Sequence, residues 1–222
     1  ENMSDSRSPS VSVVMLAHRN DEYLREALWS IKEQTFQDFE VVVVANGPEA
    51  AAVKQTVDSI GFRNSNSILA DAGSIGDLAN IGIQNARGSL IARFDSDDVS
   101  MPKRLEIQAD FMARNPKVDI IGAQALVIDQ FGKESGRLSR PVDHESIKCQ
   151  MPFRCPLIQP SVMMRKEAVL AAGGYQAGSN AEDWDLWIRL MFVQRSRFAN
   201  LPEDLIAYRI HGLQTTGRKF KQ

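Results

Sequence analysis

Three aspartates follow an apolar run in the stretch LIARFDSDDVSMP, residues 90–102. Asp95, Asp97 and Asp98 repel one another at this spacing, and each raises the pKa of the others unless a positive group lies among them. Carboxylates spaced D-x-D at the end of a strand suit a hard divalent cation such as Mg²⁺ or Mn²⁺, which prefers oxygen ligands and often bridges to the phosphates of a substrate. The alternative is a solvated turn in which Asp98 or Ser100 caps the helix that follows.

A second acidic group begins the amphipathic stretch AEDWDLWIRLM, residues 181–191. Glu182, Asp183 and Asp185 fall at the start of the predicted helix, where negative charge stabilises the helix dipole. Two tryptophans flank these acids, and a carboxylate beside an aromatic surface has a raised pKa because it is desolvated, as a general base near neutral pH requires. A plain helix start and a catalytic base therefore fit this stretch equally well.

His211 lies in the stretch YRIHG, at the end of a predicted strand. A lone histidine usually has a structural role. Near the aspartates, however, a neutral imidazole would complete a Mn²⁺ site.

The elements that position these groups follow from the pattern of apolar residues. Short β-branched runs alternate with amphipathic stretches in the first half of the chain, which is typical of a parallel α/β sheet. The predicted strands there cover residues 11–16, 39–45, 66–70 and 89–94, and the predicted helices cover 22–34, 49–61, 75–88 and 102–114.

Ligands of open α/β sheets bind beyond the carboxyl ends of the strands. Three predicted strands end in polar residues, and the topology places these ends along one edge. The groups are His18, Arg19 and Asn20 after the first strand, Asn46 and Gly47 after the second, and the three aspartates after the fourth.

The pattern is looser after residue 115. Strands are predicted at 117–129, 135–139, 159–165 and 205–211, and helices at 143–151, 166–174 and 181–191. The absence of an internal repeat or a low-complexity linker predicts one domain over residues 11–216, with a flexible arm at 1–10 and a basic tail at 217–222.

Several function classes are disfavoured by composition and by missing motifs. The formal net charge of -2 and the pI of about 6.0 argue against a nucleic-acid partner. The two cysteines, Cys149 and Cys155, suit neither a disulfide framework nor a zinc site, so we expect reduced thiols. The sequence contains no G-x-G-x-x-G, P-loop or G-x-S-x-G motif, which disfavours dehydrogenases, P-loop enzymes and serine hydrolases. If phosphates bind, a metal must hold them.

The chain contains no apolar run approaching the roughly 18 residues that span a bilayer, and no secretory signal. We therefore expect a cytoplasmic protein. The basic tail suggests contact with an anionic membrane surface as an alternative to a solvated end.

Several segments together resemble glycosyltransferase family 2, whose members have the GT-A fold. The similar segments, in chain order, are SVVMLAHRNDEYLREALWSIKEQTFQDFEVVVV, NIGIQNARGSLIARFDSDD, PSVMMRKEAVLAAGGY, AEDWDLWIRL and YRIHGLQTT. The resemblance covers residues 11–216 and implies a Rossmann-like, mostly parallel central sheet flanked by helices, with a smaller sheet region on the acceptor side. It divides the domain into a nucleotide-sugar-binding half, 11–115, and an acceptor-binding half, 116–216.

The resemblance also implies an activity: inverting transfer of a sugar from a nucleotide-diphosphate sugar to an acceptor hydroxyl, with Mn²⁺ or Mg²⁺ as cofactor. By the same resemblance, Asp97 would bind the metal directly, Asp95 would bind the ribose or the metal's water shell, and His211 would help to hold the metal or the diphosphate. Asp183 would be the general base, with Glu182 beside it.

The donor contacts implied by the resemblance lie on the first half of the chain. They are Leu16, Ala17, Arg19, Asn46, Asn80, Asp95 and Ser96, with Leu16 and Ala17 nearest the nucleobase. The donor would be a UDP-sugar, or else a GDP- or dTDP-sugar. The acceptor would be a glycan or a lipid-linked sugar, as in polysaccharide or glycolipid assembly at the inner face of a membrane.

The sequence departs from the family at two places. The second strand commonly ends in D-D-G-S, whereas this chain has VANGP. Asn46 can still hydrogen-bond to a base because its amide both donates and accepts, but the missing charge weakens the expected preference for uridine. Gln159 stands where relatives often carry histidine.

Two other functions fit parts of the pattern. A nucleotidyltransferase shares the layout, but usually carries a glycine-rich, basic loop after its first strand, where this chain has AHRNDEY without glycine. A non-catalytic relative that binds nucleotide-sugars or glycans is also consistent with the altered VANGP segment.

Overall fold

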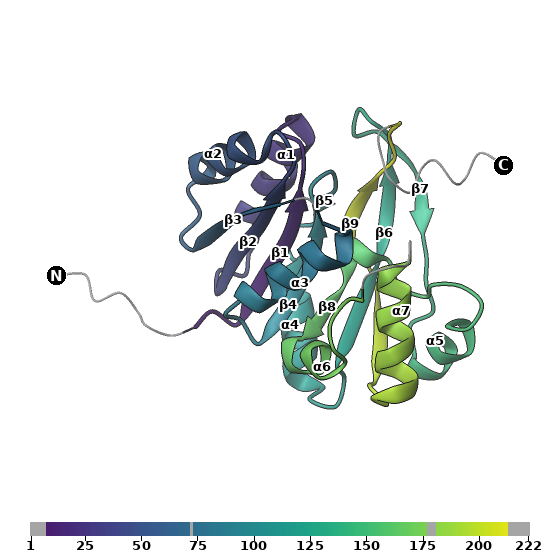
Figure 1. Cartoon of the computed structure of the whole chain (residues 1–222). Coiled ribbons are helices and arrows are strands. Elements are labelled where there is room, and N and C mark those ends of the chain that lie inside the picture. Colours follow the sequence, from purple (N-terminus) through teal and green to yellow (C-terminus); the bar gives the residue numbers. More distant parts are fainter. Residues whose placement is uncertain (1–7, 72, 177–180, 213–222) are drawn as a thin grey trace.

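In the part of the chain that the structure describes, nine strands form one sheet with helices on both of its faces (Figure 1). The computed structural model describes residues 8–71, 73–176 and 181–212. The strand order is β3-β2-β1-β4-β8-β6-β9-β5, and β7 pairs with β6. The strands are β1 (Val11–Ala17), β2 (Phe39–Asn46), β3 (Ser65–Ala70), β4 (Leu90–Asp95), β5 (Val99–Ser100), β6 (Ile120–Ile128), β7 (Glu134–Leu138), β8 (Met163–Arg165) and β9 (Phe198–Arg209).

Seven α-helices cover the sheet within the described residues: α1 (Glu22–Lys32), α2 (Ala50–Ile60), α3 (Ile75–Asn85), α4 (Arg104–Arg114), α5 (His144–Gln150), α6 (Lys166–Ala171) and α7 (Glu182–Ile188). A 3₁₀ turn, η1 (Gln159–Ser161), precedes β8, and a π-helical turn, η2 (Arg189–Val193), continues α7.

The first four strands in the sheet order form the parallel sheet that the sequence predicts. β2 and β4 both pair in parallel with β1, and β3 pairs in parallel with β2. Strands that are buried on both faces need apolar side chains at every position. In β2, Val41 and Val43 pack in the core beneath α1, α2 and α4, and Val42 packs in the core beneath α3 and α7. The predicted α/β class is confirmed.

The second half of the chain extends the same sheet through β8. β8 pairs antiparallel with both β4 and β6, and β6 pairs in parallel with β9. β5 pairs antiparallel with the far part of β9, so the loop between β4 and β5 is fastened to the sheet at both ends. This loop carries the aspartates Asp97 and Asp98, and its position therefore depends on β9.

The predicted elements differ most clearly from the structure at three places along the chain. β9 begins at Phe198 instead of residue 205, and His211 lies just beyond its end. The first residues of the predicted strand at 159–165 form η1, because Pro160 lacks the N–H that a strand ladder needs. The two-residue strand β5 was not predicted.

A side chain from the segment that follows α1 caps the start of α4. Gln34, two residues beyond the end of α1 and 2% exposed, accepts a hydrogen bond from Leu105 N at 3.0 Å. Its amide nitrogen donates to Ser100 Oγ at 3.2 Å and to Met101 O at 2.8 Å. The alternative in which Asp98 or Ser100 caps this helix is therefore wrong.

Both cysteines are free thiols, as expected, with Cys149 exposed and Cys155 half-buried. In the described part of the chain, every helix is too short or too polar to cross a lipid bilayer.

We expect Gln34→Ala to lower the free energy of unfolding by about 1–3 kcal/mol, because the change leaves the buried N–H of Leu105 without its partner. Urea denaturation measures this loss. Glu33→Ala, at an exposed position one residue away, is the control and should cost less than about 0.5 kcal/mol. Equal losses for the two variants would contradict this role for Gln34.

Candidate active site

The polar strand ends meet at one edge of the sheet, as the sequence predicts. β2, β1 and β4 are neighbours in the sheet, and Leu16 lies in register with both Val44 and Asp95 (Figure 1). The residues after β1, Asn46 at the end of β2 and the aspartate loop after β4 therefore share the carboxyl edge of the parallel strands.

The three aspartates bring their carboxylates together at this edge. One carboxylate oxygen from each of Asp95, Asp97 and Asp98 lies within 4.8 Å of the others, and this is the one group of three or more potential metal-binding side chains in the described residues. The oxygen atoms and the spacing suit a divalent cation.

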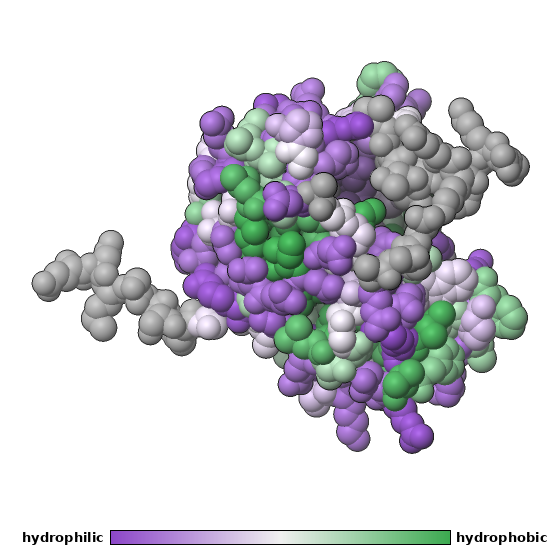
Figure 2. Space-filling model, in the orientation of Figure 1, coloured by the Kyte–Doolittle hydropathy of each residue, from purple (hydrophilic) through white to green (hydrophobic). Residues whose placement is uncertain are grey.

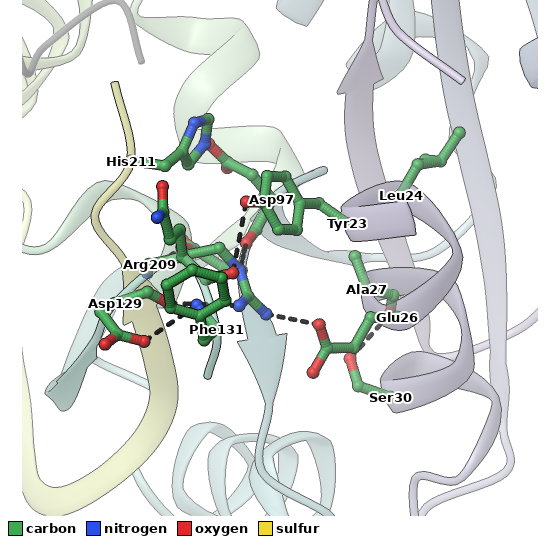
Figure 3. A network of polar contacts seen from close by, with 12 residues as sticks. Tyr23, Leu24, Glu26, Ala27, Ser30, Asp97, Asp129, Phe131, Arg209 and His211 are labelled. Carbon is green, nitrogen blue, oxygen red and sulfur yellow. Dashed lines mark hydrogen bonds and ion pairs between the residues drawn. The ribbon is translucent and has the colours of Figure 1, made fainter. Parts of the chain in front are cut away.

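Each aspartate is held by a different neighbour. Asp95 Oδ1 lies 3.4 Å from Arg93 Nη2, and Asp97 Oδ2 lies 2.9 Å from His211 Nε2 (Figure 3). Asp98 is 1% exposed and its Oδ1 accepts a hydrogen bond from the main-chain N–H of Arg209 at 2.8 Å. The second oxygen of Asp98, Oδ2, is buried without a hydrogen-bond partner.

Burial dominates the electrostatics of this cluster. Burial raises the pKa of Asp95 to about 6, and the nearby charges of Asp97 and Asp183 act in the same direction. Burial and the neighbouring carboxylates also hold the pKa of Asp98 well above its usual range. Burial and mutual repulsion therefore both disfavour the charged carboxylates of this cluster, and a bound cation would stabilise them.

Two buried arginines lie near the cluster. Arg93 is 2% exposed and points from β4 to Val14 O, to which its Nη1 donates at 2.8 Å. Arg104 is fully buried and donates to Arg93 O at 2.7 Å, and burial lowers its pKa to about 9. The positive charges of both arginines lower the pKa of Asp95 and so counteract part of the effect of burial. The sequence analysis did not predict this counter-charge, although the arginine within the apolar run LIARF was a signal that could have indicated it.

Asp183, at the start of α7, belongs to the same site. Its charge raises the pKa of Asp95, and burial raises its own pKa in turn. Asp183 Oδ1 accepts a hydrogen bond from Trp184 N at 2.8 Å, and Trp184 Nε1 donates to Met151 O at 2.8 Å. Glu182 beside it is half-buried, on the part of α7 that contacts α3. The structure thus brings together the two acidic groups found in the sequence.

The remaining predicted donor contacts lie at different depths along the edge. Ala17 is 1% exposed, while Leu16, Arg19, Asn46 and Ser96 are half-buried. Neighbouring Asn20 has a structural function, since its Oδ1 accepts a hydrogen bond from Thr56 Oγ1 at 2.6 Å.

Asn80, on α3, forms a two-bond clamp on the main chain of Tyr175. Its Nδ2 donates to Tyr175 O at 2.7 Å, and its Oδ1 accepts from Tyr175 N at 2.9 Å. Gly174 makes room for the clamp, because a Cβ there would lie 2.4 Å from Asn80 Oδ1. A donor contact by Asn80 stays a prediction, and in this structure both ends of its amide are engaged.

Known proteins are similar to this chain in sequence and in fold. The family model for glycosyl transferase family 2 matches residues 12–172. The O-antigen biosynthesis glycosyltransferase WbnJ of Escherichia coli is 35% identical over 208 residues, which cover 92% of this chain and 81% of that protein. The amylovoran biosynthesis glycosyltransferase AmsE of Erwinia amylovora is 31% identical over 207 residues, 90% of this chain and 75% of that protein.

Solved structures show the same fold at low identity. Staphylococcus aureus TarS 1–349 in complex with UDP-GlcNAc has a TM-score of 0.74 at 16% identity, covering 92% of this chain and 60% of that one. The mannosyltransferase PcManGT of Pyrobaculum calidifontis, in complex with GDP-Man and Mn²⁺, has a TM-score of 0.69 at 15% identity, covering 96% of this chain and 59% of that one. The expected GT-A fold is confirmed, and this chain spans about three fifths of each of these two structures.

We expect Asp95→Asn to stabilise the metal-free protein at pH 8 but not at pH 4. A carboxyl whose pKa is raised to about 6 by folding favours the folded state below its unfolded pKa, and that contribution is lost as pH rises through about 6. Because 38% of the Asp95 side chain is exposed, solvent screening limits the gain to about 1 kcal/mol. Urea denaturation with EDTA at the two pH values measures the change in the free energy of unfolding. A variant less stable than the wild type at pH 8 would contradict the claim that the charged Asp95 carboxylate is unfavourable in the folded protein.

Proposed function

Because this chain belongs to glycosyltransferase family 2, we propose that it transfers a sugar from a nucleotide-diphosphate sugar to an acceptor hydroxyl with inversion at the anomeric carbon. Family membership shows that the chain is a glycosyltransferase. We propose the class of donor, the use of a metal ion and the stereochemistry of the transfer. The observation that carries it is the meeting of three carboxylates, Asp95, Asp97 and Asp98, with the half-buried Asp183 at one edge of the sheet. Membership of glycosyltransferase family 2 argues against the alternative in which the chain is a nucleotidyltransferase.

The donor half of the proposed single domain over 11–216 would hold the nucleotide. Leu16, Ala17 and Asn46 would contact the base and Asp95 the ribose, and Arg19, Asn80 and Ser96 are further proposed donor contacts. TarS in complex with UDP-GlcNAc and PcManGT in complex with GDP-Man support a nucleotide-sugar donor. A UDP-sugar is the first choice, followed by a GDP- or dTDP-sugar.

The donor atoms at the aspartate cluster fit Mn²⁺ or Mg²⁺. Carboxylate oxygens are the ligands these ions prefer, and the buried Oδ2 of Asp98 has no other partner. Asp97 would bind the ion directly, with Asp95 and His211 beside it. When bound, the metal supplies Lewis-acid neutralisation of the diphosphate leaving group.

Asp183 would act as the general base. Its raised pKa makes the carboxylate a stronger proton acceptor, and its hydrogen bond from Trp184 N fixes its orientation. The acceptor oxygen would form its bond to the anomeric carbon as the bond to the diphosphate breaks, and its proton would pass to Asp183. Glu182 lies beside the base.

The acceptor would be a glycan or a lipid-linked sugar, bound by residues of the second half, 116–216. The Escherichia coli protein named UDP-Gal:alpha-D-GlcNAc-diphosphoundecaprenol beta-1,3-galactosyltransferase, 28% identical over 191 residues, supports a UDP-sugar and a lipid-linked acceptor. WbnJ and AmsE support a role in assembling O-antigen or other polysaccharide. We place the protein in the cytoplasm, at the inner face of the membrane.

We expect Asp183→Asn to lower kcat about 10²–10⁴-fold while donor binding is unchanged, because only proton removal is affected. Asp97→Ala should abolish both transfer and Mn²⁺ binding. Release of nucleoside diphosphate measures turnover, and calorimetry with a panel of nucleotide-sugars measures binding.

Asp185→Asn is the matched control, since Asp185 lies on the same turn but pairs with Arg189. It should keep near-normal transfer. Near-normal transfer by Asp183→Asn would remove its role as base. Metal-dependent binding of a donor by the wild type without turnover on any acceptor would favour a non-catalytic relative instead.

A separate prediction concerns the base. Asn46→Asp restores the acid that the family commonly has at this strand end, and we expect it to raise the kcat/KM for the UDP-sugar relative to the GDP-sugar. The gain should be about tenfold, which is the worth of one hydrogen bond strengthened by charge. Competition between the two donors measures it, and an unchanged ratio would exclude Asn46 from base recognition.

A further inference from the structure

Arg209, the last residue of β9, connects the aspartate loop to two other segments, α1 and the loop after β6 (Figure 3). Its side chain is 2% exposed. Its Nε donates to Asp97 O at 2.9 Å and its main-chain N–H to Asp98 Oδ1 at 2.8 Å. Its Nη1 donates to Asp129 O at 3.4 Å, and its Nη2 forms an ion pair with Glu26 Oε2 at 2.5 Å.

Tyr23, on α1, packs its ring against two of the groups beside the metal ligands. The guanidinium carbon of Arg209 lies 4.7 Å from the ring centroid, and the imidazole of His211 lies 4.9 Å away, centroid to centroid, at an interplanar angle of 39°. The Tyr23 hydroxyl donates to Gln130 O at 3.3 Å. The Tyr23 ring thus packs against His211, whose imidazole in turn contacts the Asp97 carboxylate.

Tyr23 and Glu26 are three residues apart and so share a face of α1. α1 itself is firmly placed, because Leu24, Leu28 and Ile31 are buried in the core. A buried guanidinium is costly unless its N–H groups are paired, so Arg209 ties the path of the aspartate loop to α1. A shift of the loop would break several of these contacts together.

We propose that Tyr23 and Glu26 are positioning residues for the metal-binding carboxylates. Tyr23 orients His211 towards Asp97, and the two α1 residues together fix Arg209, which holds the main chain of Asp97 and the carboxylate of Asp98. This inference rests on the proposed function, because it presumes that the aspartate cluster binds a divalent cation.

The test measures Mn²⁺ affinity directly, by the electron paramagnetic resonance signal of free Mn²⁺, with and without UDP. Loss of a group that orients a metal ligand typically weakens metal binding about 10–100-fold. We expect Tyr23→Leu, which removes the flat ring, to weaken Mn²⁺ binding at least about tenfold. Tyr23→Phe keeps the ring and should bind Mn²⁺ within about twofold of the wild type.

Glu26→Ala tests the second contact at a half-exposed position, since 48% of the Glu26 side chain is exposed. Glu26→Ala should weaken Mn²⁺ binding several-fold. If Tyr23→Leu does not fold, the result with Glu26→Ala alone tests the positioning role. Arg25→Ala, at an exposed position between the two, should bind Mn²⁺ like the wild type.

Asp97→Ala separates the two proposals. If Asp97→Ala still binds Mn²⁺ normally, the proposed metal site itself is wrong. If Asp97→Ala loses Mn²⁺ while Tyr23→Leu and Glu26→Ala bind it like the wild type, only the positioning role is overturned. Equal weakening by Tyr23→Phe and Tyr23→Leu would also overturn it, because the ring would then not matter.

Discussion

The repulsion among Asp95, Asp97 and Asp98 is the constraint on which the site depends. Three carboxylates within 4.8 Å of one another, of which Asp98 is buried and the other two are half-buried, are unfavourable without opposing charge. The protein supplies part of that charge with the buried Arg93 and Arg104. Burial, together with the charges of Asp97 and Asp183, still raises the pKa of Asp95, and one oxygen of Asp98 has no hydrogen-bond partner. A divalent cation is the group that would stabilise both carboxylates.

The sheet delivers these charges to one place. Parallel β1, β2 and β4 end at a common edge, while β9 returns from the other half of the chain and fastens the aspartate loop through β5 and Arg209. The first half of the chain is a regular parallel sheet, whereas contacts from β9, in the second half, fasten the loop that carries Asp97 and Asp98. A change in the second half can therefore alter the position of these aspartates in the first.

The position of much of the candidate site could be predicted from the sequence, because its residues follow strand ends that the apolar pattern marks clearly. The placement of Asp97 and Asn46 at one edge of the sheet was predicted in this way. The contacts of Arg104, Arg209 and Tyr23 were not predicted, since a charged or aromatic residue inside an amphipathic stretch is usually interpreted as a surface or core residue. Asn80 shows the same limit: its sequence position suits a donor contact, and the fold occupies its amide with the main chain of Tyr175.

The sequence by itself determined the order of helices and strands, the α/β class and the two acidic groups, because each depends on residues close together in the chain. Only the tertiary structure decided that Asp183 lies near Asp95, that Gln34 caps α4, and that Arg209 pairs with Glu26, 183 positions away in the chain. These contacts join segments whose approach depends on sheet order and register. No local pattern of residues encodes which distant side chain will satisfy a buried charge.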